Sequence, residues 1–380
     1  MRILHFSDTH LGYNDLDKVT RQGVNLREQD FYDAFVQVID RALEIKPDVI
    51  IHSGDFFHRP SPANRPMIFA LEQLNRIAKA KIPIVIIAGN HSTPKTIYTS
   101  PILQAFKSIS GVYPIFNQAY ENIVLGGMAI HGLPHINDER LMQEQMDLIA
   151  PVTGKYNVIM LHTSIGKEYI MDEYGEQLFP KERIEMLDQF DYVALGHWHN
   201  QQRVKKLKSG WYCGSTERMS ETEIGKEKGF YLIDFKKNKQ VAPEFITIPT
   251  RPWLKIEIKK CKEKTTEEIE TELTTALAKI NVVDALLSVY FVDIEPLQSI
   301  ALSNRKINDL APDATHIQIK RQFISTDGTK QNNWNSSTET LDQLISDFII
   351  ESTSDKDRGK LLADKARYYY DLFQRGERKG

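Results

Sequence analysis

The sequence predicts an α/β fold for its first half, and two patterns support this. Short apolar, β-branched runs alternate with longer segments whose apolar residues recur at helical spacing. The helical patterns cover residues 27–46 and 65–80, and the apolar runs indicate buried strands at 2–7, 48–53, 83–88, 157–161 and 192–195. Shorter strand patterns without long helices between them lie at 112–116, 122–125, 128–131, 210–214 and 228–235. We therefore expect a mixed sheet or two packed sheets, with the run that contains Pro114 at a sheet edge.

The composition is that of an ordinary globular protein. The chain has 380 residues, of which 41% are hydrophobic and 26% charged, which suits about two or three domains with buried cores. Apolar runs are far shorter than the roughly 20 residues that cross a bilayer, and the start has no long apolar run of the signal-peptide kind, so we expect a cytoplasmic protein. The two cysteines, Cys213 and Cys261, are too few for a disulfide framework or a thiolate metal cage. Any metal must use other ligands.

Three later segments differ in composition from the first. Prolines 243, 249 and 252 interrupt any regular element near residues 241–252, so we expect a first domain over 1–245 and a small α+β domain over 252–324. In the latter, residues 265–280 form an amphipathic helical pattern with Thr265 and Glu268 as a capping box. The polar segment 325–337 is typical of a linker.

Two helical patterns close the chain over residues 338–380. Their apolar faces suit either a helical hairpin packed on itself or docking on a partner helix. The apolar residues that we expect to bind a partner are Leu341, Leu344, Ile345, Phe348, Tyr369, Leu372 and Phe373.

Charge is unevenly distributed along the chain. The net charge of −3 argues against a general polyanion binder. Residues 201–264, however, contain 16 basic and 8 acidic side chains, a net charge of +8, which could neutralise phosphates. Arg203, Lys205, Lys206 and Lys208 are the candidate DNA contacts, although lysines also protect strand edges from aggregation.

Residues of metal-ligand type follow five of the predicted strands. They form the motifs Asp8-x-His10, Gly54-Asp55-x-x-His58, Gly89-Asn90-His91, His162 and Gly196-His197-x-His199. Ten of the eleven histidines lie in the first 199 residues. Because loops past the carboxyl ends of strands converge on one crevice in α/β sheets, separate motifs can build one site.

The donors of this site are oxygens and imidazoles without thiolates, which suits Mn²⁺, Fe²⁺ or a similar ion. Seven donors are too many for one ion. If Asp55 bridges, two ions about 3.5–4 Å apart can acidify a water and hold phosphoryl oxygens, which is machinery for phosphate ester hydrolysis. The candidate ligands are Asp8, His10, Asp55, Asn90, His162, His197 and His199.

The five motifs, in this order, resemble those of the calcineurin-like metallophosphoesterases. Gly-Asp-Phe-Phe-His, which ends at His58, the turn at 212–216 and the run at 228–235 are further similar to SbcD-type nuclease subunits of the double-strand-break repair nuclease and ATPase complex. The resemblance implies a four-layer α-β-β-α sandwich with a small capping domain. It places one metal on Asp8, His10, Asp55 and His199 and the other on Asp55, Asn90, His162 and His197.

The same resemblance implies roles for two further histidines. His91 would act near the leaving oxygen, as general acid or phosphate-orienting group, and His58 would help to place the end of its strand. The family commonly has an acidic residue after Gly-Asn-His, whereas this chain has Ser92. A hydroxyl can orient an imidazole but stabilises its protonated form less than a carboxylate does, so we expect slower turnover or a lower pH optimum.

The resemblance implies a Mn²⁺-dependent DNA exonuclease and endonuclease that forms a two-fold dimer and docks an SMC-like coiled-coil ATPase through its terminal helices. If the source is prokaryotic, the protein would be associated with the nucleoid. No Gly-x-x-x-x-Gly-Lys-Ser/Thr loop occurs in the chain, so nucleotide hydrolysis would come from the partner. Two alternatives are a phosphatase or cyclic-nucleotide phosphodiesterase on the same scaffold, and a weakly active DNA-end scaffold.

Five other histidines are interpreted as structural or remote from the site. We expect His5 and His52 to be packed or hydrogen-bonded within strands, and His131, His135 and His316 to have no part in the chemistry. Trp198 either forms a wall of the pocket or packs beneath its loop.

Overall fold

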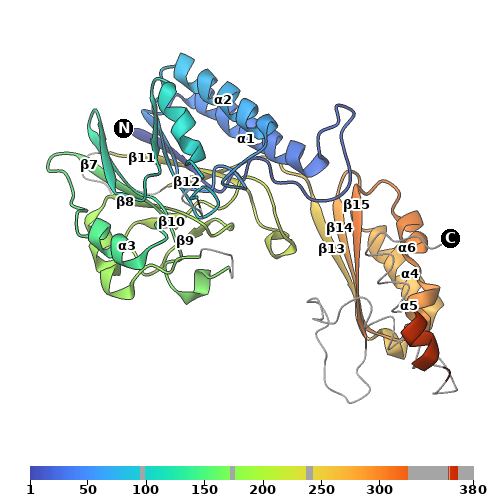
Figure 1. Ribbon diagram of the computed structural model, residues 1–380. Coiled ribbons are helices and arrows are strands. Elements are labelled where there is room, and N and C mark those ends of the chain that lie inside the picture. The colour runs from blue at the N-terminus through green and yellow to red at the C-terminus, as the bar shows by residue number, and fades with distance from the viewer. Residues whose placement is uncertain (95–98, 172–175, 237–242, 324–357, 359, 367–380) are drawn as a thin grey trace. The chain divides into compact units, whose positions relative to one another are not determined.

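The computed structural model describes residues 1–94, 99–171, 176–236, 243–323, 358 and 360–366 (Figure 1). The chain divides into two compact units. The first contains Met1–Leu254 and Asp284–Leu286, and the second contains Lys255–Val283 and the described residues from Leu287 onward. Each unit is described by itself.

The first sheet of the first unit has the order β12-β11-β1-β2-β3-β4. Strands β1 (Arg2–Phe6), β2 (Val49–His52), β3 (Ile84–Ile87) and β4 (Val112–Ile115) are parallel, and β11 (Gly229–Asp234) and β12 (Glu244–Thr247) extend the sheet antiparallel. Pro114 lies in the edge strand β4, as predicted, because an edge strand tolerates the missing N–H. The accompanying helices are α1 (Leu26–Ile45), α2 (Asn64–Lys79) and the 3₁₀ helix η1 (Ile102–Ser108).

The two long helices confirm the predicted helical patterns to within one residue. α1 begins after Asn25, whose side chain accepts hydrogen bonds from the amides of Arg27 and Glu28 and so satisfies two donors of the first turn. Phe31, Phe35 and other apolar residues at helical spacing face the core.

The second sheet has the order β5-β6-β7-β8-β10-β9. Strands β6 (Met128–Leu133), β7 (Tyr156–His162), β8 (Tyr192–Gly196) and β10 (Gly210–Tyr212) are parallel, and β5 (Glu121–Leu125) and β9 (Gln202–Arg203) are antiparallel edges. The helices of this half are α3 (Glu139–Met146) and the 3₁₀ turns η2 (Lys167–Tyr169), η3 (Lys181–Gln189) and η4 (Glu221–Glu223).

The two sheets pack face to face and give four layers (Figure 1). Alternation along β7 shows this directly. Val158 and Met160 enter the large core between the sheets, whereas Ile159 and Leu161 enter a second core on the opposite face, which includes Met142 of α3. The α-β-β-α sandwich expected from the resemblance is thus confirmed.

The second unit is a small α+β structure. Its sheet has the order β13-β14-β15, formed by β13 (Trp253–Ile258), β14 (Leu286–Ile294) and β15 (His316–Phe323). The helical elements are η5 (Cys261–Glu263), α4 (Thr266–Leu277), α5 (Pro296–Ala301) and α6 (Asn304–Leu310). Thr265 and Glu268 form the predicted capping box of α4.

The prediction that prolines interrupt every regular element over residues 241–252 is wrong. This segment contains β12, which pairs with β11 through contacts such as Phe230 with Ile246. Pro243 and Pro249 flank the strand rather than interrupt it, so its backbone can still form a ladder. The first unit therefore continues past residue 245.

The linker at 325–337 and the expected partner-binding residues Leu341, Leu344, Ile345, Phe348, Tyr369, Leu372 and Phe373 lie outside the described residues. Of the helices that the structure describes, none combines the length and apolar character needed to cross a bilayer.

Candidate dimetal site

The five predicted motifs meet where strands of the two sheets end. Asp8, Asp55 and Asn90 follow β1, β2 and β3 of the first sheet, while His162 ends β7 and His197 follows β8 of the second. Backbone hydrogen bonds join the loops, since the amide of Asp8 donates to Gly54 O at 3.1 Å and the amide of His10 donates to Asp55 O at 3.0 Å. The site is therefore assembled by both sheets.

The backbone of this site is strained at four of the candidate ligands. Asp8, His10, Asp55 and His197 have φ angles of 50°, 39°, 52° and 90°. Such conformations cost of order 1–3 kcal/mol each and persist only where the surrounding structure fixes them. All four residues are at least nine-tenths buried, so the strained backbone lies in the interior of the site.

Asp8, His10 and His199 form the first donor cluster. One ligand atom of each lies within 4.8 Å of those of the other two. His10 Nε2 lies 3.2 Å from His199 Nε2, so two ring nitrogens face each other across a short gap.

Asp8, Asp55 and His162 form the second donor cluster, again within 4.8 Å of one another. His162 Nε2 lies 3.1 Å from Asp55 Oδ2 and 3.0 Å from Asn90 Oδ1. His162 Nδ1 is 2.9 Å from Ser53 O and must carry a proton to donate to this carbonyl. In the neutral ring, Nε2 is then a lone-pair donor that faces two oxygens.

Asp8 belongs to both clusters, and Asp55 of the second cluster also reaches His10 of the first. Asp55 Oδ1 accepts a hydrogen bond from the His91 amide at 2.9 Å. Its Oδ2 is buried and lies 3.1 Å from His162 Nε2 and 3.9 Å from His10 Nε2. A Cβ on Gly89 would come within 2.2 Å of Asp55 Oδ1, so glycine there leaves room for the carboxylate. The arrangement suits a bridging carboxylate.

The charges of the site fit a pair of divalent cations. Burial would raise the pKa of Asp55, but His162 and His91 outweigh burial and hold this pKa well below its usual range. Burial lowers the pKa of His162, but the nearby carboxylates of Asp55 and Asp8 outweigh burial and raise this pKa to about 9. Burial lowers the pKa of His10 well below its usual range. In the metal-free protein a proton on His162 thus offsets the charge of Asp55, and a bound cation would take the place of that proton.

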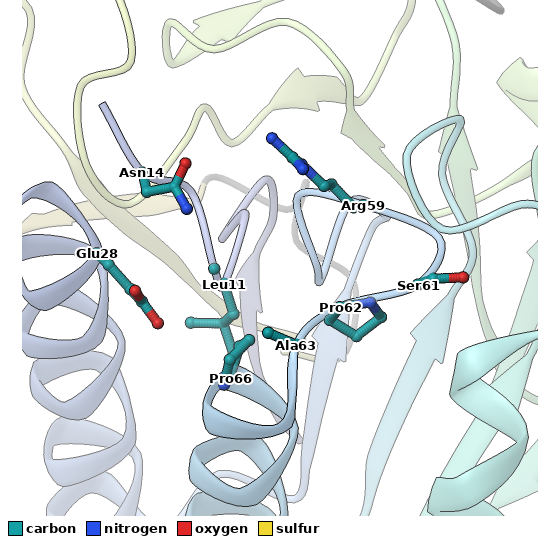
Figure 2. Close-up of a pocket in the computed structure, with 9 residues that line it drawn as sticks. Leu11, Asn14, Glu28, Arg59, Ser61, Pro62, Ala63 and Pro66 are labelled. Carbon is teal, nitrogen blue, oxygen red and sulfur yellow. The ribbon is translucent and has the colours of Figure 1, made fainter. Parts of the chain in front are cut away.

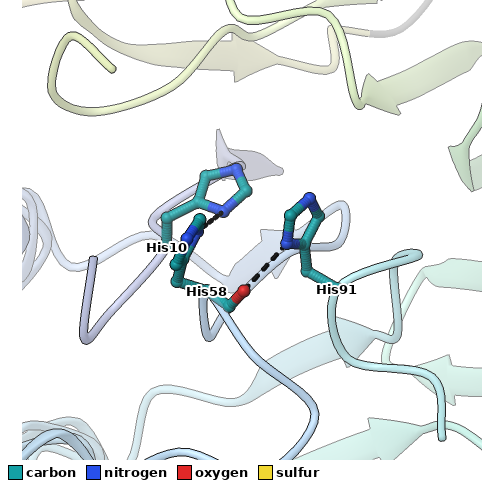
Figure 3. Close-up of side chains that lie close together, drawn as sticks. All are labelled: His10, His58 and His91. Carbon is teal, nitrogen blue, oxygen red and sulfur yellow. Dashed lines mark hydrogen bonds between the residues drawn. The ribbon is translucent and has the colours of Figure 1, made fainter. Parts of the chain in front are cut away.

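His91 lies beside His10 and His58 (Figure 3), and one ligand atom of each lies within 4.8 Å of those of the other two. His91 Nδ1 is 2.8 Å from the backbone oxygen of His58, to which it must donate, so Nε2 can serve the substrate. The His58 ring stacks on that of His91 at a centroid separation of 5.2 Å, and its Nδ1 lies 3.5 Å from His10 Nδ1. His58 therefore contacts both the candidate acid and a candidate ligand.

Ser92 does not orient His91 through its hydroxyl, although its residue type would allow it. Ser92 Oγ is buried and has no hydrogen-bond partner within the described part of the chain. The His58 carbonyl orients the ring instead, which a sequence motif cannot reveal because every residue has a carbonyl.

Glu176 is a site residue that the sequence analysis missed. Its Oε1 accepts a hydrogen bond from His197 Nε2 at 3.1 Å, which leaves His197 Nδ1 for the site. The amide of His197 donates to Asp8 Oδ1 at 3.0 Å. A single glutamate in a loop carries no recognisable spacing, so only tertiary structure identifies it.

Three of the remaining histidines are hydrogen-bonded as the sequence analysis expects of structural residues. His5 is hydrogen-bonded to Tyr192 and Ser53, and His52 to Thr9, within the core. His131 contacts Tyr120 and Asn157, away from the donor clusters. Trp198 packs against Tyr169 beneath its loop.

The basic candidates lie on an exposed strip that begins at β9. Arg203 stacks over Trp211 with 5.7 Å from its guanidinium carbon to the ring centroid. Lys206 pairs with Glu168 at 2.8 Å, and Lys208 lies 4.0 Å from Asp188. Ion pairing therefore offsets part of the positive charge counted in the sequence, while Lys205 adds a further exposed cation.

A cavity of about 260 Å³ adjoins the loops that carry His10 and His58. Figure 2 shows Asn14 and Arg59 on one side of it and Pro66, at the start of α2, on the other. Its lining residues are Leu11, Gly12, Asn14, Glu28, Arg59, Ser61, Pro62, Ala63 and Pro66. The cavity is a concave neighbour of the site, lined by both polar and apolar side chains.

Comparison with known proteins agrees with this geometry. Residues 1–201 match the family model of the calcineurin-like phosphoesterases, and the chain belongs to this family. Metal-dependent phosphoester hydrolysis, predicted from the motifs, is thereby confirmed as its class of activity.

Its relatives include proteins named DNA double-strand break repair protein Mre11. That of Sulfurisphaera tokodaii is 35% identical over 285 residues, which cover 69% of each chain. That of Methanococcus maripaludis is 29% identical over 71% of this chain and 74% of its own. That of Sulfolobus acidocaldarius is 28% identical over 368 residues, which cover 92% of this chain and 90% of its own. The similarity therefore extends beyond the phosphoesterase domain.

Proposed function

We propose that this protein is a Mn²⁺-dependent DNA nuclease that hydrolyses phosphodiesters at DNA ends, and endonucleolytically near them, in double-strand break repair. The observation that carries the proposal is the pair of donor clusters that share Asp8 and that Asp55 also links, with His91 beside them. The names of the Mre11 relatives indicate the DNA substrate. Such a role would place the protein in the cytoplasm, at the nucleoid if the source is prokaryotic.

We assign the candidate ligands to two metal ions. Asp8, His10, Asp55 and His199 would hold one ion, and Asp55, Asn90, His162 and His197 the other. When bound, such ions acidify a water and polarise the phosphodiester. The mixed oxygen and imidazole donors favour Mn²⁺ over Mg²⁺, which prefers oxygen ligands.

His91 would act on the substrate directly. Because its Nδ1 proton is committed to His58 O, its Nε2 can hold a proton for the leaving oxygen or orient a phosphate oxygen. His58 would position His91 through this carbonyl and through ring stacking.

The other parts of the chain would supply binding. We assign DNA contact to Arg203, Lys205, Lys206 and Lys208, which are exposed, and to the small domain at 252–324. The terminal segment 338–380 would dock an SMC-like coiled-coil ATPase, and the nuclease domains would form a homodimer.

End-labelled duplex and single-stranded DNA, incubated with the protein and Mn²⁺, test the activity. We expect progressive shortening that falls about 10²–10⁴-fold in His91→Ala and is unchanged in the neighbouring control Ser92→Ala. Turnover of bis-p-nitrophenyl phosphate or cyclic nucleotides with inert DNA would instead indicate a phosphatase or phosphodiesterase. Salt-sensitive DNA binding without hydrolysis would indicate a scaffold.

Removal of residues 338–380 tests the ATPase assignment. The truncated protein should still cleave short DNA but fail to co-purify with the ATPase subunit. Retention of the subunit at full strength would contradict the docking role.

A further inference from the structure

A buried ion pair lies directly behind His199. Lys228 precedes β11, and Glu223 ends η4. Both side chains are almost wholly inaccessible, and Lys228 Nζ is bonded to Glu223 Oε2. The sequence pattern at 228–235 indicates a strand and a family resemblance but no role for Lys228.

Lys228 uses all three of its N–H donors inside the protein. Besides Glu223, it donates to His199 O and to Ser215 Oγ, each at 2.8 Å. The lysine therefore fixes the backbone of His199.

Glu223 faces the ring of the same histidine. Glu223 Oε1 lies 3.5 Å from His199 Nδ1 and accepts hydrogen bonds from the amides of Met219 and Ser220 at 3.1 and 3.2 Å. Its Oε2 accepts from Ser215 Oγ at 3.0 Å as well as from Lys228. The opposite edge of the ring carries Nε2, which faces His10. Lys228 thus binds the backbone of His199, and Glu223 faces its ring.

Stability alone does not explain this arrangement. Two ions taken out of water cost several kcal/mol each in desolvation, and an apolar pair of similar volume is often no less stable. Glu223 accepts hydrogen bonds from the Lys228 ammonium and from two backbone amides, surroundings that favour a charged carboxylate beside the imidazole.

We propose that Glu223 and Lys228 are positioning residues for His199. The Glu223 carboxylate keeps the ring proton on Nδ1, Lys228 fixes the His199 carbonyl, and Nε2 is thereby presented to a metal ion as a lone-pair donor. The inference rests on the proposed role of His199 as a ligand.

Mn²⁺ binding to the full-length, metal-free protein tests this inference without reference to DNA cleavage. The free ion is measured by its electron paramagnetic resonance signal during titration. We expect wild type to bind two ions and Glu223→Gln to bind one of them about 10–100-fold more weakly. Glu223→Asp should recover part of the affinity, since it restores the charge.

Two further variants separate positioning from folding. Glu223→Gln/Lys228→Met leaves no unpaired buried charge, so it keeps the test available if Glu223→Gln does not fold, and it should show the same weakened site. Asp30→Asn removes another buried carboxylate, which pairs with Arg27 and Arg251 away from the clusters. It should lower the unfolding temperature but bind both ions as wild type does.

Nitrogen-15 NMR reports which ring nitrogen of His199 carries the proton. Nitrogen-15 histidine spectra should assign the Nδ1-protonated tautomer to His199 in wild type and a mixture of tautomers in the double variant. Wild-type Mn²⁺ affinity in the folded double variant would overturn the inference. Failure of wild type to bind any Mn²⁺ would instead overturn the proposed ligand set.

Discussion

His199 and His197 stand two residues apart on one loop, yet the protein supports them differently. His199 is backed by Glu223 and Lys228, both at least 98% buried. His197 is backed by Glu176, whose side chain is 12% exposed and which also accepts hydrogen bonds from Ser164 and Met171. Equal ligand types with unequal support imply that the two metal positions differ in affinity.

Substitution of Asp55, the proposed bridging carboxylate, should have the largest effect because it weakens both metal positions. Asp55→Asn weakens donation to both clusters, because Oδ2 faces His10 and His162 alike. We expect Mn²⁺ stoichiometry to fall below one per chain and nuclease activity to fall below detection. Titration by electron paramagnetic resonance checks this, and retention of one tightly bound ion would argue against a bridging role.

The pH dependence of metal binding should be the next largest effect. With a pKa of about 9, His162 in the metal-free protein is protonated throughout the range below that value. An ion must displace this proton, so affinity at the His162 position should rise about tenfold per pH unit up to about pH 9 and level off above it.

Proton release into a weakly buffered indicator solution measures this directly. Addition of Mn²⁺ at pH 7 should release close to one proton per chain at the His162 position. His10, whose pKa is lowered by burial, should contribute none. Affinity that is flat between pH 6.5 and 8 would contradict the shifted pKa of His162.

Glu176→Gln should have a smaller effect than the changes at Glu223. The amide still accepts the hydrogen bond from His197 Nε2 through its oxygen but loses the charge, so we expect the ion at that position to bind at most about tenfold more weakly. Parallel Mn²⁺ titration of Glu176→Gln and Glu223→Gln compares the two supports. A larger loss in Glu176→Gln would reverse the order inferred from burial.

Ser92→Ala should have the smallest effect. The hydroxyl has no hydrogen-bond partner among the described residues, so its removal costs little and relieves an unsatisfied buried group. Cleavage rate and unfolding temperature should both stay close to those of wild type. A marked loss of rate would show that Ser92, not only the His58 carbonyl, orients His91.

Much of the fold could be predicted from periodicity. The helices α1 and α2, the edge position of Pro114 and the parallel strands that end in ligand motifs all follow from local patterns. The strand β12 could not, because its partner β11 supplies the hydrogen bonds that its own residues do not indicate.

The sequence by itself determined the donor types and the strand ends that carry them, because a motif that follows a buried strand is local information. Only the tertiary structure decided how the donors meet: which oxygen of Asp55 faces both clusters, which carbonyl orients His91, and which carboxylates stand behind His197 and His199. These depend on side chains from distant segments, such as Glu176 and Glu223, being brought together by the packing of two sheets. No spacing along the chain encodes that contact.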